Sequence, residues 1–486
     1  MKILYINPPQ IRAGLDYVFK AQPLNLLSIA AAVPEHDAKL IDFKIQRISQ
    51  SLLESEFNRC DLVAITSLTP QIYSALRIAE LAKKKGCITI LGGYHPTLDS
   101  DFVIKNNSVD YVIRGEGENT FQELIALIDG NQNGKSKKEI NGISYRDKAG
   151  KIINTQARFL EPNLDNFPMP RRDLIDYEDY SLIASLETSR GCPFKCRFCC
   201  IHKMWEDPRN KLRYRTKSIK RILQEIYKID LHNNFIFFVD DNFTINVERT
   251  KKILNAIIKS GISNQIYFSC QSRIDTLYHN PSLIDLMHKA GMKQIFLGIE
   301  SVHQQSLDRM NKKNITPSMT RKVVKMLQDF GICIFGGVII GYPGETKKMV
   351  RQNIQFIKDL ELDFVQFTPI TAFPGTEFFN KMVEKKRIRT RNYRKYDLFN
   401  SMMDTNELDV KELQNLVLEA YSYYYLSGGW LRLITKRYIN PFGKYNWYLS
   451  KIHKVARKVI FNGLQMFKSQ GISNGLISDK LKLINE

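Results

Sequence analysis

Residues 189–200 read SRGCPFKCRFCC, and this stretch holds three cysteines in a C-x3-C-x2-C spacing. Cys192, Cys196 and Cys199 are close enough in the chain for one short loop to direct three thiolates at the same inorganic group. Cysteine thiolates are the usual protein ligands of iron–sulfur clusters, and a cubane cluster has four irons. Three cysteines would leave one iron free to bind a small molecule, so the spacing predicts a catalytic cluster.

Two other uses of these cysteines fit the sequence less well. Disulfides are rare in a reducing cytosol, and cysteines this close together give poor loop closure. A structural zinc ion needs four tetrahedral ligands, whereas Cys200 directly follows Cys199 and His202 is badly spaced to serve as the fourth. We therefore interpret the rest of the chain around an iron–sulfur cluster.

The cysteine loop resembles the signature of the radical S-adenosylmethionine enzymes. In that family the methionyl amine and carboxylate of S-adenosylmethionine chelate the open iron, and an electron from the cluster releases a 5'-deoxyadenosyl radical. The resemblance implies a 4Fe–4S cluster on Cys192, Cys196 and Cys199, S-adenosylmethionine as a cofactor, and a low-potential electron donor such as ferredoxin or flavodoxin as a partner. It also implies that Phe198, directly before the third cysteine, lies against the adenine.

The composition is that of a soluble globular protein. The 486 residues suggest about three domains, and 43% hydrophobic with 25% charged residues is an ordinary balance. No apolar run reaches the roughly 20 residues that span a bilayer, and the amino terminus does not resemble a signal peptide. We therefore expect a cytoplasmic protein, with attachment to a membrane surface as an alternative. The net charge of +21 favours anionic partners, although an A/T-rich genome encodes a similar composition.

Residues 1–140 alternate short apolar runs with helical patterns. Helices are predicted at 23–33 and 70–85, and strands at 2–7, 39–41, 62–66, 87–91 and 111–114. This alternation predicts a doubly wound, Rossmann-like parallel sheet, whose ligands bind at the carboxyl ends of the strands. Small and polar residues follow three of those strands: Ser67, Leu68, Thr69, Gly92, Gly93, Gly115 and Glu116.

These strand ends resemble the cobalamin-binding domain over roughly residues 1–130, and the resemblance implies that they bind cobalamin. The glycines would let the backbone approach a large planar ligand closely. The D-x-H-x-x-G motif, which supplies a lower histidine to cobalt in many such domains, is absent. We therefore expect cobalt without a histidine ligand, and His95 as a loop or wall residue.

The middle of the chain predicts a second α/β domain. Residues 141–180 are predicted as a hairpin around Gly150 followed by an irregular interdomain linker. Between 181 and 400, helices are expected at 218–229, 247–260 and 316–330, the last with Thr316 as N-cap and Pro317 at its first position. Strands are expected at 182–188, 235–239, 267–270, 294–298, 333–339 and 364–368. Six such repeats predict a partial (β/α)6 TIM-type barrel, whose chemistry lies at the carboxyl ends of its strands.

The residues that follow these strands take their expected roles from the resemblance to the radical family. Asp240 and Asp241 stand where that family contacts the methionyl amine. The ribose and carboxylate would be held by Gln271, Arg273, Glu300 and Ser301, and the adenine would lie beside Gly337, Ile339 and Gly341. Any of these could instead be a barrel-rim or salt-bridging residue. A magnesium site at the paired aspartates would lack a phosphate-binding loop, and no residue is assigned as a catalytic acid or base.

Residues 401–486 are predicted to be helical and basic. One apolar stripe is followed by the aromatic run YSYYYLSGGW at 421–430, a candidate to cap the barrel mouth. A later helix has lysines on one face and an apolar face formed by Tyr448, Ile452, Val455 and Val459. Such a helix fits either ordinary packing on the barrel or an interfacial membrane contact.

The order of cobalamin-like domain, radical barrel and helical tail resembles the cobalamin-dependent radical S-adenosylmethionine proteins. The resemblance implies a C-methyltransferase acting on an apolar or lipid-like small molecule. The alternative within that family is an anaerobic oxidative cyclase or rearrangement enzyme. A tRNA methylthiotransferase would bring three further amino-terminal cysteines and an RNA-binding barrel, whereas Cys60 and Cys87 alone cannot hold a second cluster. Nucleic acid is therefore not expected as a partner, and a binding protein without turnover is the last alternative.

Overall fold

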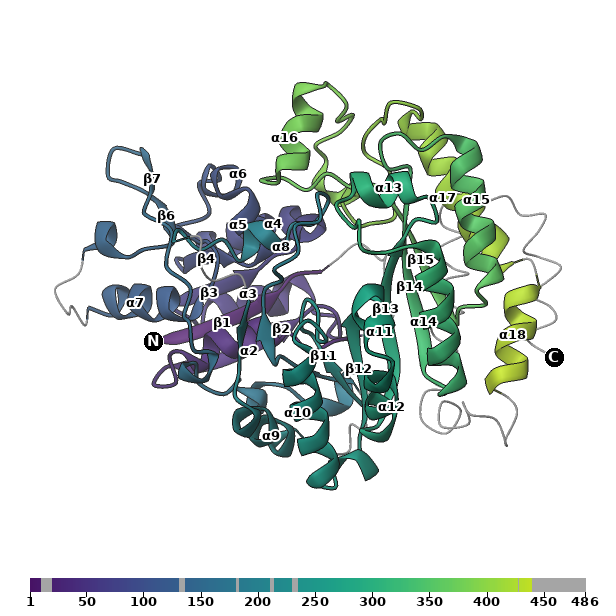
Figure 1. Cartoon of the computed structure of the whole chain (residues 1–486). Coiled ribbons are helices and arrows are strands. Elements are labelled where there is room, and N and C mark those ends of the chain that lie inside the picture. Colours follow the sequence, from purple (N-terminus) through teal and green to yellow (C-terminus); the bar gives the residue numbers. More distant parts are fainter. Residues whose placement is uncertain are drawn as a thin grey trace.

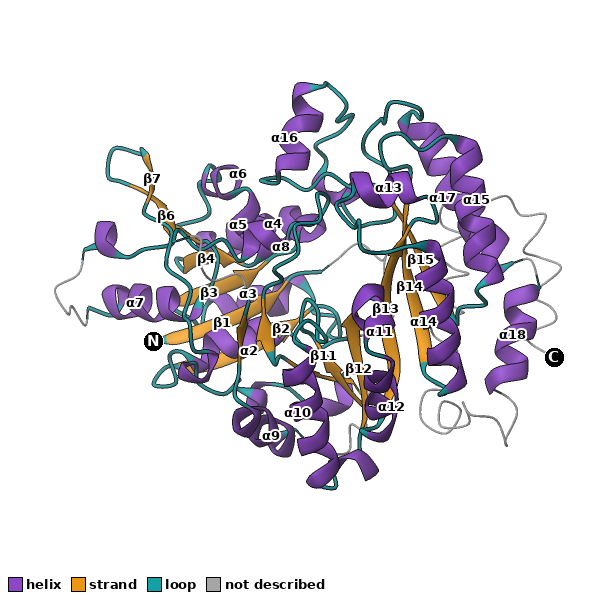
Figure 2. Cartoon of the chain, viewed as in Figure 1, coloured by secondary structure: helices purple, strands orange, loops and turns teal. Residues whose placement is uncertain are grey.

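The computed structural model describes residues 1–9, 20–130, 136–180, 183–209, 214–229, 235–426 and 428–438. These residues form two α/β lobes that lie side by side, one from the amino-terminal part of the chain and one from its centre (Figure 1). Each lobe is built on its own sheet (Figure 2). The basic helix expected around residues 448–459 lies outside the described residues. No helix in the described part is long and apolar enough to cross a membrane.

The first sheet has seven strands in the order β2-β1-β3-β4-β5-β6-β7. Its strands are β1 Lys2–Asn7, β2 Asp37–Asp42, β3 Leu62–Thr66, β4 Ile88–Gly92, β5 Tyr111–Ile113, β6 Ile143–Arg146 and β7 Ile152–Asn154. Its helices are α2 Leu24–Ala31, α3 Gln50–Phe57, α4 Ile72–Lys84, α5 Tyr94–Leu98, α6 Ser100–Ile104 and α7 Glu118–Ile128. Strands β1 to β5 run parallel, which confirms the predicted parallel sheet.

Both faces of this sheet are buried, because successive side chains of a strand point to opposite faces. Ile3 and Tyr5 of β1 belong to a core with α2 and α7, whereas Leu4 and Ile6 belong to a second core with α3 and α4. A parallel strand covered on both sides needs a continuous apolar run. The sequence KILYI supplies it, and the sheet is doubly wound as predicted.

The hairpin around Gly150 extends the first sheet. β6 pairs antiparallel with β5, and β7 pairs antiparallel with β6. From sequence we grouped this hairpin with the linker, because a hairpin pattern carries no signal for the sheet edge that it joins. Only three short 3₁₀ helices lie between the hairpin and the second sheet among the described residues: η3 Leu164–Asn166, η4 Arg172–Leu174 and η5 Tyr177–Asp179.

The second sheet has six parallel strands in the order β15-β14-β13-β12-β11-β8. Its strands are β8 Ile183–Leu186, β11 Phe235–Phe238, β12 Tyr267–Ser272, β13 Met292–Glu300, β14 Cys333–Ile340 and β15 Phe364–Pro369. Its helices are α9 Ile219–Lys228, α10 Val247–Lys259, α11 Ile274–His279, α12 Pro281–Lys289, α13 Gln304–Arg309, α14 Pro317–Asp329 and α15 Lys347–Asp359. β8 and β15 stand at opposite edges, so the predicted partial barrel is confirmed.

Local sequence sets where the barrel helices begin. The side chains of Ser218, Asn246, Thr316 and Thr346 each accept a hydrogen bond from the backbone N–H three residues further on. Such caps satisfy a donor that the first helical turn leaves free. Thr316 and Pro317 occupy the predicted N-cap and first helical positions.

The aromatic run covers the edge strand β15. It belongs to α17 Val410–Tyr425 and α18 Gly429–Tyr438, which follow α16 Glu377–Glu384 and the 3₁₀ helix η7 Tyr393–Lys395. Tyr424 and Trp430 donate to backbone carbonyls just before the strand, and the Tyr425 hydroxyl bonds to both the N–H and the carbonyl of Val365 at 2.7 Å. These residues stand at the amino end of β15, opposite the barrel mouth. The expectation that the run caps the mouth is therefore wrong: the tyrosines satisfy backbone groups that an edge strand leaves unpaired.

Candidate active site

A pocket of about 360 Å³ lies where the carboxyl end of the first sheet faces the barrel. Its wall includes the last residues of β1, β3, β4 and β5: Asn7, Thr66, Gly92 and Ile113. From the barrel side it includes residues that follow β8 and β11: Glu187, Ser189, Arg190, Val239 and Asp241. One cavity is therefore shared by the ligand-binding edge of the sheet and the segment that leads into the cysteine loop.

The cysteine loop follows the short strand β9 Ser189–Arg190, which pairs with β10 Arg215–Thr216. Gly191 turns the chain into the loop with a φ of 87°, a conformation that side chains rarely adopt. Cys192, Cys196 and Cys199 are half-buried free thiols. Burial raises the pKa of the Cys192 thiol to about 11, and the neighbouring Cys196 adds to this rise.

This donor set fits an iron–sulfur cluster. Buried thiols such as Cys192 and Cys199, whose pKa values are raised by burial, become stable thiolates when a cationic metal group binds them. No three His, Cys, Asp or Glu side chains in the described part of the chain are spaced to share one metal ion. In a cubane cluster each cysteine binds its own iron atom. The loop therefore presents the ligand type that such a cluster needs.

The two aspartates that follow β11 have different hydrogen-bond partners. Asp240 is buried and accepts hydrogen bonds from the Thr188 N–H at 2.7 Å and from the hydroxyls of Thr188 and Ser189 at 2.5 Å. Asp241 lies on the pocket wall and accepts from the Gly191 N–H at 3.0 Å and from Trp205 Nε1 at 2.9 Å. Burial raises the pKa of Asp241 to about 6. Asp240 thus holds the start of the cysteine loop, and Asp241 faces the cavity.

Of the two predicted residues at the end of β12, Arg273 lies close to the cysteine loop. The Arg273 guanidinium is 3.7 Å from the centre of the Phe194 ring, and its Nη1 is 3.9 Å from the Cys196 Sγ. The other nitrogens of Arg273 donate to Asp275 at 2.9 and 2.7 Å. Gln271 is half-buried, and its backbone carbonyl accepts from the Phe243 N–H at 3.0 Å.

The predicted residues at the carboxyl ends of β13 and β14 are tightly packed. Lys312 Nζ lies 2.5 Å from Glu300 Oε1 and 5.9 Å from the ring of Phe198, so this buried ion pair borders the cysteine loop. The Ser301 hydroxyl donates to Glu345 at 2.9 Å. Gly337 and Ile339 are buried in β14. A Cβ at Gly337 would press on the Phe296 ring, and one at Gly341 would overlap Leu413 of α17. Both glycines are thus explained as packing positions.

Five of the seven predicted cobalamin residues line the pocket: Leu68, Gly92, Gly93, Gly115 and Glu116. Ser67 and Thr69, on either side of Leu68 in the chain, are buried. Gly93 has φ 95° and ψ −161°, a region open only to glycine, and a Cβ there would come within 2.7 Å of Thr66 Oγ1. No side chain therefore fits at Gly93, whereas a Cβ at Gly115 would meet nothing within 4 Å, so a ligand can approach the backbone there.

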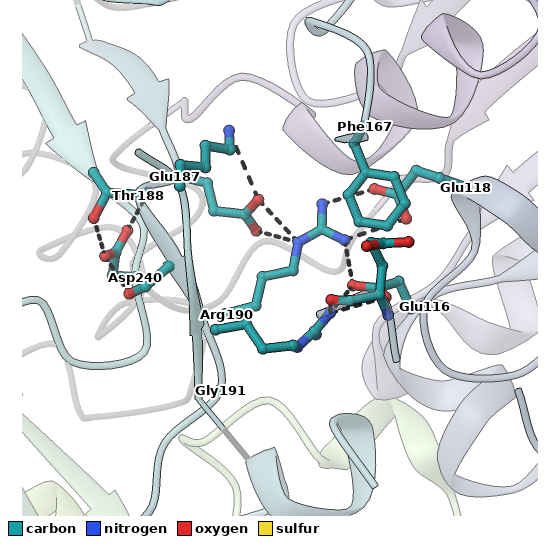
Figure 3. A network of polar contacts seen from close by, with 12 residues as sticks. Glu116, Glu118, Phe167, Glu187, Thr188, Arg190, Gly191 and Asp240 are labelled. Atoms are coloured by element: carbon teal, nitrogen blue, oxygen red, sulfur yellow. Dashed lines mark hydrogen bonds and ion pairs between the residues drawn. The ribbon is translucent and has the colours of Figure 1, made fainter. Parts of the chain in front are cut away.

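Glu116 is the predicted cobalamin residue whose side chain has another use (Figure 3). Its carboxylate is bonded to Arg190 and Arg215, each at 2.8 Å, and it accepts from the Glu161 N–H at 3.0 Å. Glu118, at the first position of α7, also binds Arg190. The backbone of this turn borders the cavity, whereas its carboxylates bind the other lobe.

From sequence His95 was expected as a loop or wall residue, whereas it is buried in the short helix α5 that follows β4. Its side chain packs against Phe102 and Tyr393, and its Nδ1 is 3.4 Å from Thr69 Oγ1. Burial lowers the pKa of His95 to about 4. It does not belong to the pocket wall.

Among the pocket residues without a predicted role, the structure brings together Tyr94, Glu118, Arg190 and Trp205. Two weak signals were present in the sequence. Arg190 stands directly before the Gly-Cys pair that opens the loop, and Glu118 completes a Gly-Glu-Gly-Glu repeat. Neither signal identifies the residue on the other side of the contact.

Two family models match the chain. The radical SAM superfamily model matches residues 186–357, which contain the cysteine loop and most of the barrel. The B12 binding domain model matches residues 13–125, which contain the parallel part of the first sheet.

Curated proteins match over most of their length. An uncharacterized methyltransferase of Pyrococcus horikoshii is 32% identical over 88% of this chain and 93% of that protein. The anaerobic magnesium-protoporphyrin IX monomethyl ester cyclase of Rubrivivax gelatinosus is 25% identical over 97% of this chain and 83% of the cyclase. The hopanoid C-3 methylase of Methylococcus capsulatus is 26% identical over 83% of this chain and 76% of the methylase.

A solved structure shows the same fold. The cobalamin-dependent S-adenosylmethionine radical enzyme OxsB, with aqua-cobalamin and S-adenosylmethionine bound, superposes with a TM-score of 0.69 at 19% sequence identity. The match covers 100% of this chain and 75% of that chain.

Proposed function

Because this chain belongs to the cobalamin-dependent radical S-adenosylmethionine enzymes, a family of methyltransferases and cyclases, we propose that it methylates an unactivated carbon of an apolar, lipid-like molecule. The family's cofactors are a 4Fe–4S cluster, S-adenosylmethionine and cobalamin. When bound, S-adenosylmethionine at the cluster supplies a radical that removes a hydrogen atom, and cobalamin supplies the methyl group. The cluster also needs an electron, for which we propose a low-potential protein donor.

The shared pocket is the observation that carries this proposal. Gly92, Gly93 and Gly115 form its wall on the side of the first sheet, and Arg190 and Asp241 form its wall on the side of the cysteine loop. A radical source and a methyl source can act on the same carbon only where their sites open into one space. The two lobes provide that space at the carboxyl ends of both parallel sheets, where ligands of such folds bind.

The residues of the chain have distinct proposed tasks. Cys192, Cys196 and Cys199 ligate the cluster. Asp241 faces the cavity and is the candidate acceptor for the methionyl amine, while Asp240 has its oxygens engaged by Thr188 and Ser189 and only holds the loop.

Two further groups of residues are proposed to position S-adenosylmethionine. The Glu300–Lys312 pair borders Phe198 and is placed to orient the adenosyl part. Arg273, whose Nη1 faces Cys196, is placed to fix the loop and to bind a carboxylate beside the cluster.

An apolar methyl acceptor agrees with the way charges are arranged on the pocket wall. Arg190 is paired with glutamates of the first lobe, and Lys217 with Glu225 at 2.8 Å. Leu68, Ile113, Phe121, Met204 and Val239 contribute apolar surface. Paired charges offer little to a charged substrate, so the acceptor would be held by its apolar surface. The similarity to a hopanoid C-3 methylase supports the same class of substrate.

The test uses anaerobically reconstituted protein with hydroxocobalamin, a reductant and S-adenosylmethionine that carries a deuterated methyl group. Lipid and pigment extracts from a deletion strain serve as the source of acceptor. We expect 5'-deoxyadenosine, methylcobalamin and one product that gains the deuterated methyl. Cleavage of S-adenosylmethionine without any formation of methylcobalamin would contradict methyl transfer. A product that gains no carbon would instead identify a cyclase, the alternative that the similarity to the magnesium-protoporphyrin cyclase favours.

A further inference from the structure

We propose that Arg190 is a positioning residue that couples the cobalamin pocket to the cysteine loop, so that a ligand in the pocket tightens the binding of S-adenosylmethionine at the cluster. The basis is the contact of Arg190 with Glu116 and Glu118 across the two lobes. The proposal rests on the cofactors of the proposed function and is independent of the methyl acceptor.

All three nitrogens of the Arg190 side chain donate hydrogen bonds to glutamates (Figure 3). Its Nη1 donates to Glu116 at 2.8 Å and to Glu118 at 3.2 Å, and its Nη2 donates to the other oxygen of Glu118 at 2.7 Å. Its Nε donates to both oxygens of Glu187 at 2.9 and 3.0 Å. The Arg190 side chain is 8% exposed, and those of Glu116 and Glu118 are 4% and 6% exposed. Solvent therefore cannot substitute for either partner.

The loop is held from the barrel side as well. The Thr188 N–H and the Ser189 hydroxyl donate to Asp240, and the Gly191 N–H donates to Asp241. The segment from Thr188 to Gly191 is therefore bonded to the barrel through its backbone and small side chains, and to the first lobe through Arg190. A shift of the turn that holds Glu116 and Glu118 would be transmitted to Arg190, which lies two positions before Cys192.

A second arginine of the barrel lobe also binds the carboxylate of Glu116. Arg215 of β10, the strand paired with β9, donates to both oxygens of Glu116 at 2.8 and 2.9 Å. Both strands of the ladder that leads into the cysteine loop thus bind one glutamate of the first lobe. The planar guanidinium suits this bidentate geometry better than an ammonium group would.

Residues of this ion-pair network also line the pocket. Arg190, Glu116 and Glu118 all belong to the pocket wall, as do Gly115 and Gly117 on either side of Glu116. A ligand seated on this turn restricts it, and the restricted turn holds Arg190 in one orientation. Buried ion networks add little net stability because desolvation offsets their attraction, and their best-attested use is to specify one arrangement.

The test measures linkage and needs no substrate turnover. The dissociation constant of S-adenosylmethionine is measured on cluster-loaded protein by equilibrium dialysis, with and without saturating hydroxocobalamin. Allosteric coupling is typically about fivefold or more and must be reciprocal. We expect hydroxocobalamin to lower the dissociation constant of S-adenosylmethionine by about fivefold or more in the wild type. In the Arg190→Gln variant it should lower that constant by less than about twofold.

Three further variants keep the test decisive. Arg190→Gln leaves the buried carboxylate of Glu118 without its arginine, so Arg190→Gln/Glu118→Gln restores the charge balance and should fold while still lacking the coupling. The Arg190→Lys variant should retain part of the coupling between the two ligands. The control Arg158→Gln breaks an ion pair with Glu123 of α7 that does not reach the barrel, and it should keep the wild-type ratio.

A folded double variant with the wild-type ratio would overturn the proposal, and so would a wild-type protein in which the two ligands bind independently. Failure of methyl transfer with the coupling intact would count against the proposed function alone.

Discussion

The Nη2 of Arg190 lies 2.7 Å from the Oε1 of Glu118, although the two residues are 72 positions apart in the chain. Arg190 ends the strand that leads into the cysteine loop, and Glu118 begins helix α7 of the first lobe. The two lobes are therefore joined by buried ion pairs of Arg190 and Arg215 with Glu116 and Glu118. This junction and the pocket beside it lead to expectations that can be measured separately.

The Cys196→Ala variant should abolish the cluster and the release of 5'-deoxyadenosine, because two remaining thiolates cannot hold a cubane cluster at its catalytic position. Cluster absorbance and anaerobic S-adenosylmethionine cleavage are the measurements. The control is Cys200→Ala in the same loop, which should keep both. A Cys196→Ala protein with full cleavage activity would remove the basis of the proposed chemistry.

The Gly93→Ala variant should weaken the binding of hydroxocobalamin by about tenfold, which corresponds to about 1.4 kcal/mol. The backbone of Gly93 occupies a region open only to glycine, and its new Cβ would displace Thr66 at the pocket wall. Binding is followed by absorbance titration. Gly130→Ala is the matched control, because Gly130 also has a positive φ but nothing within 4 Å of its Cβ position. Equal losses of affinity in both variants would argue that backbone strain alone, and not the wall, is responsible.

The Glu300→Gln variant should weaken the binding of S-adenosylmethionine by about tenfold, the effect of losing one hydrogen bond to a charged group. The carboxylate of Glu300 holds Lys312 beside Phe198, so its neutralisation loosens the region proposed for the adenosyl group. Cluster absorbance should stay unchanged. Glu248→Gln, which removes an exposed pair with Lys251 on α10, should leave the affinity as it is. Unaltered affinity in Glu300→Gln would restrict Glu300 to barrel packing.

His95 should make the folded protein less stable in mild acid. Burial lowers its pKa from 6.5 to about 4, so between these values the unfolded chain binds a proton that the folded protein does not. Stability therefore falls as the pH falls through that window, by about 2 kcal/mol between pH 7 and pH 5 for this residue. Urea denaturation at the two pH values compares the wild type with His95→Gln, which should lose this part of the pH dependence. An identical pH dependence in both proteins would show that His95 is protonated in the folded state.

Much of the architecture could be predicted because its signals are local. The apolar run LVAIT became the strand Leu62–Thr66, and Thr316 and Pro317 opened a helix where capping chemistry requires it. Strand and helix alternation then implies that the carboxyl ends of the strands meet at one edge. This is why Gly92 and Gly93 could be assigned to one edge of the first sheet, and the cysteine loop and Asp241 to one edge of the barrel, from the sequence.

The individual roles of the site residues could not be predicted, because they depend on contacts between distant segments. Asp240 and Asp241 are adjacent and chemically identical, yet one has its oxygens bonded to Thr188 and Ser189 while the other faces the pocket. Glu116 follows Gly115, a glycine predicted to bind cobalamin, yet the carboxylate of Glu116 binds two arginines of the barrel lobe. The aromatic run was expected at the barrel mouth, yet it covers the edge strand at the other end.

The sequence by itself therefore determined the two α/β lobes, their order and the cysteine loop, since hydrophobic periodicity, capping and ligand spacing act over a few residues. The tertiary structure alone decided which polar groups meet. A buried charge is stable only beside a partner, and the partner of Arg190 is selected by how the lobes pack, a relationship that no spacing along the chain records.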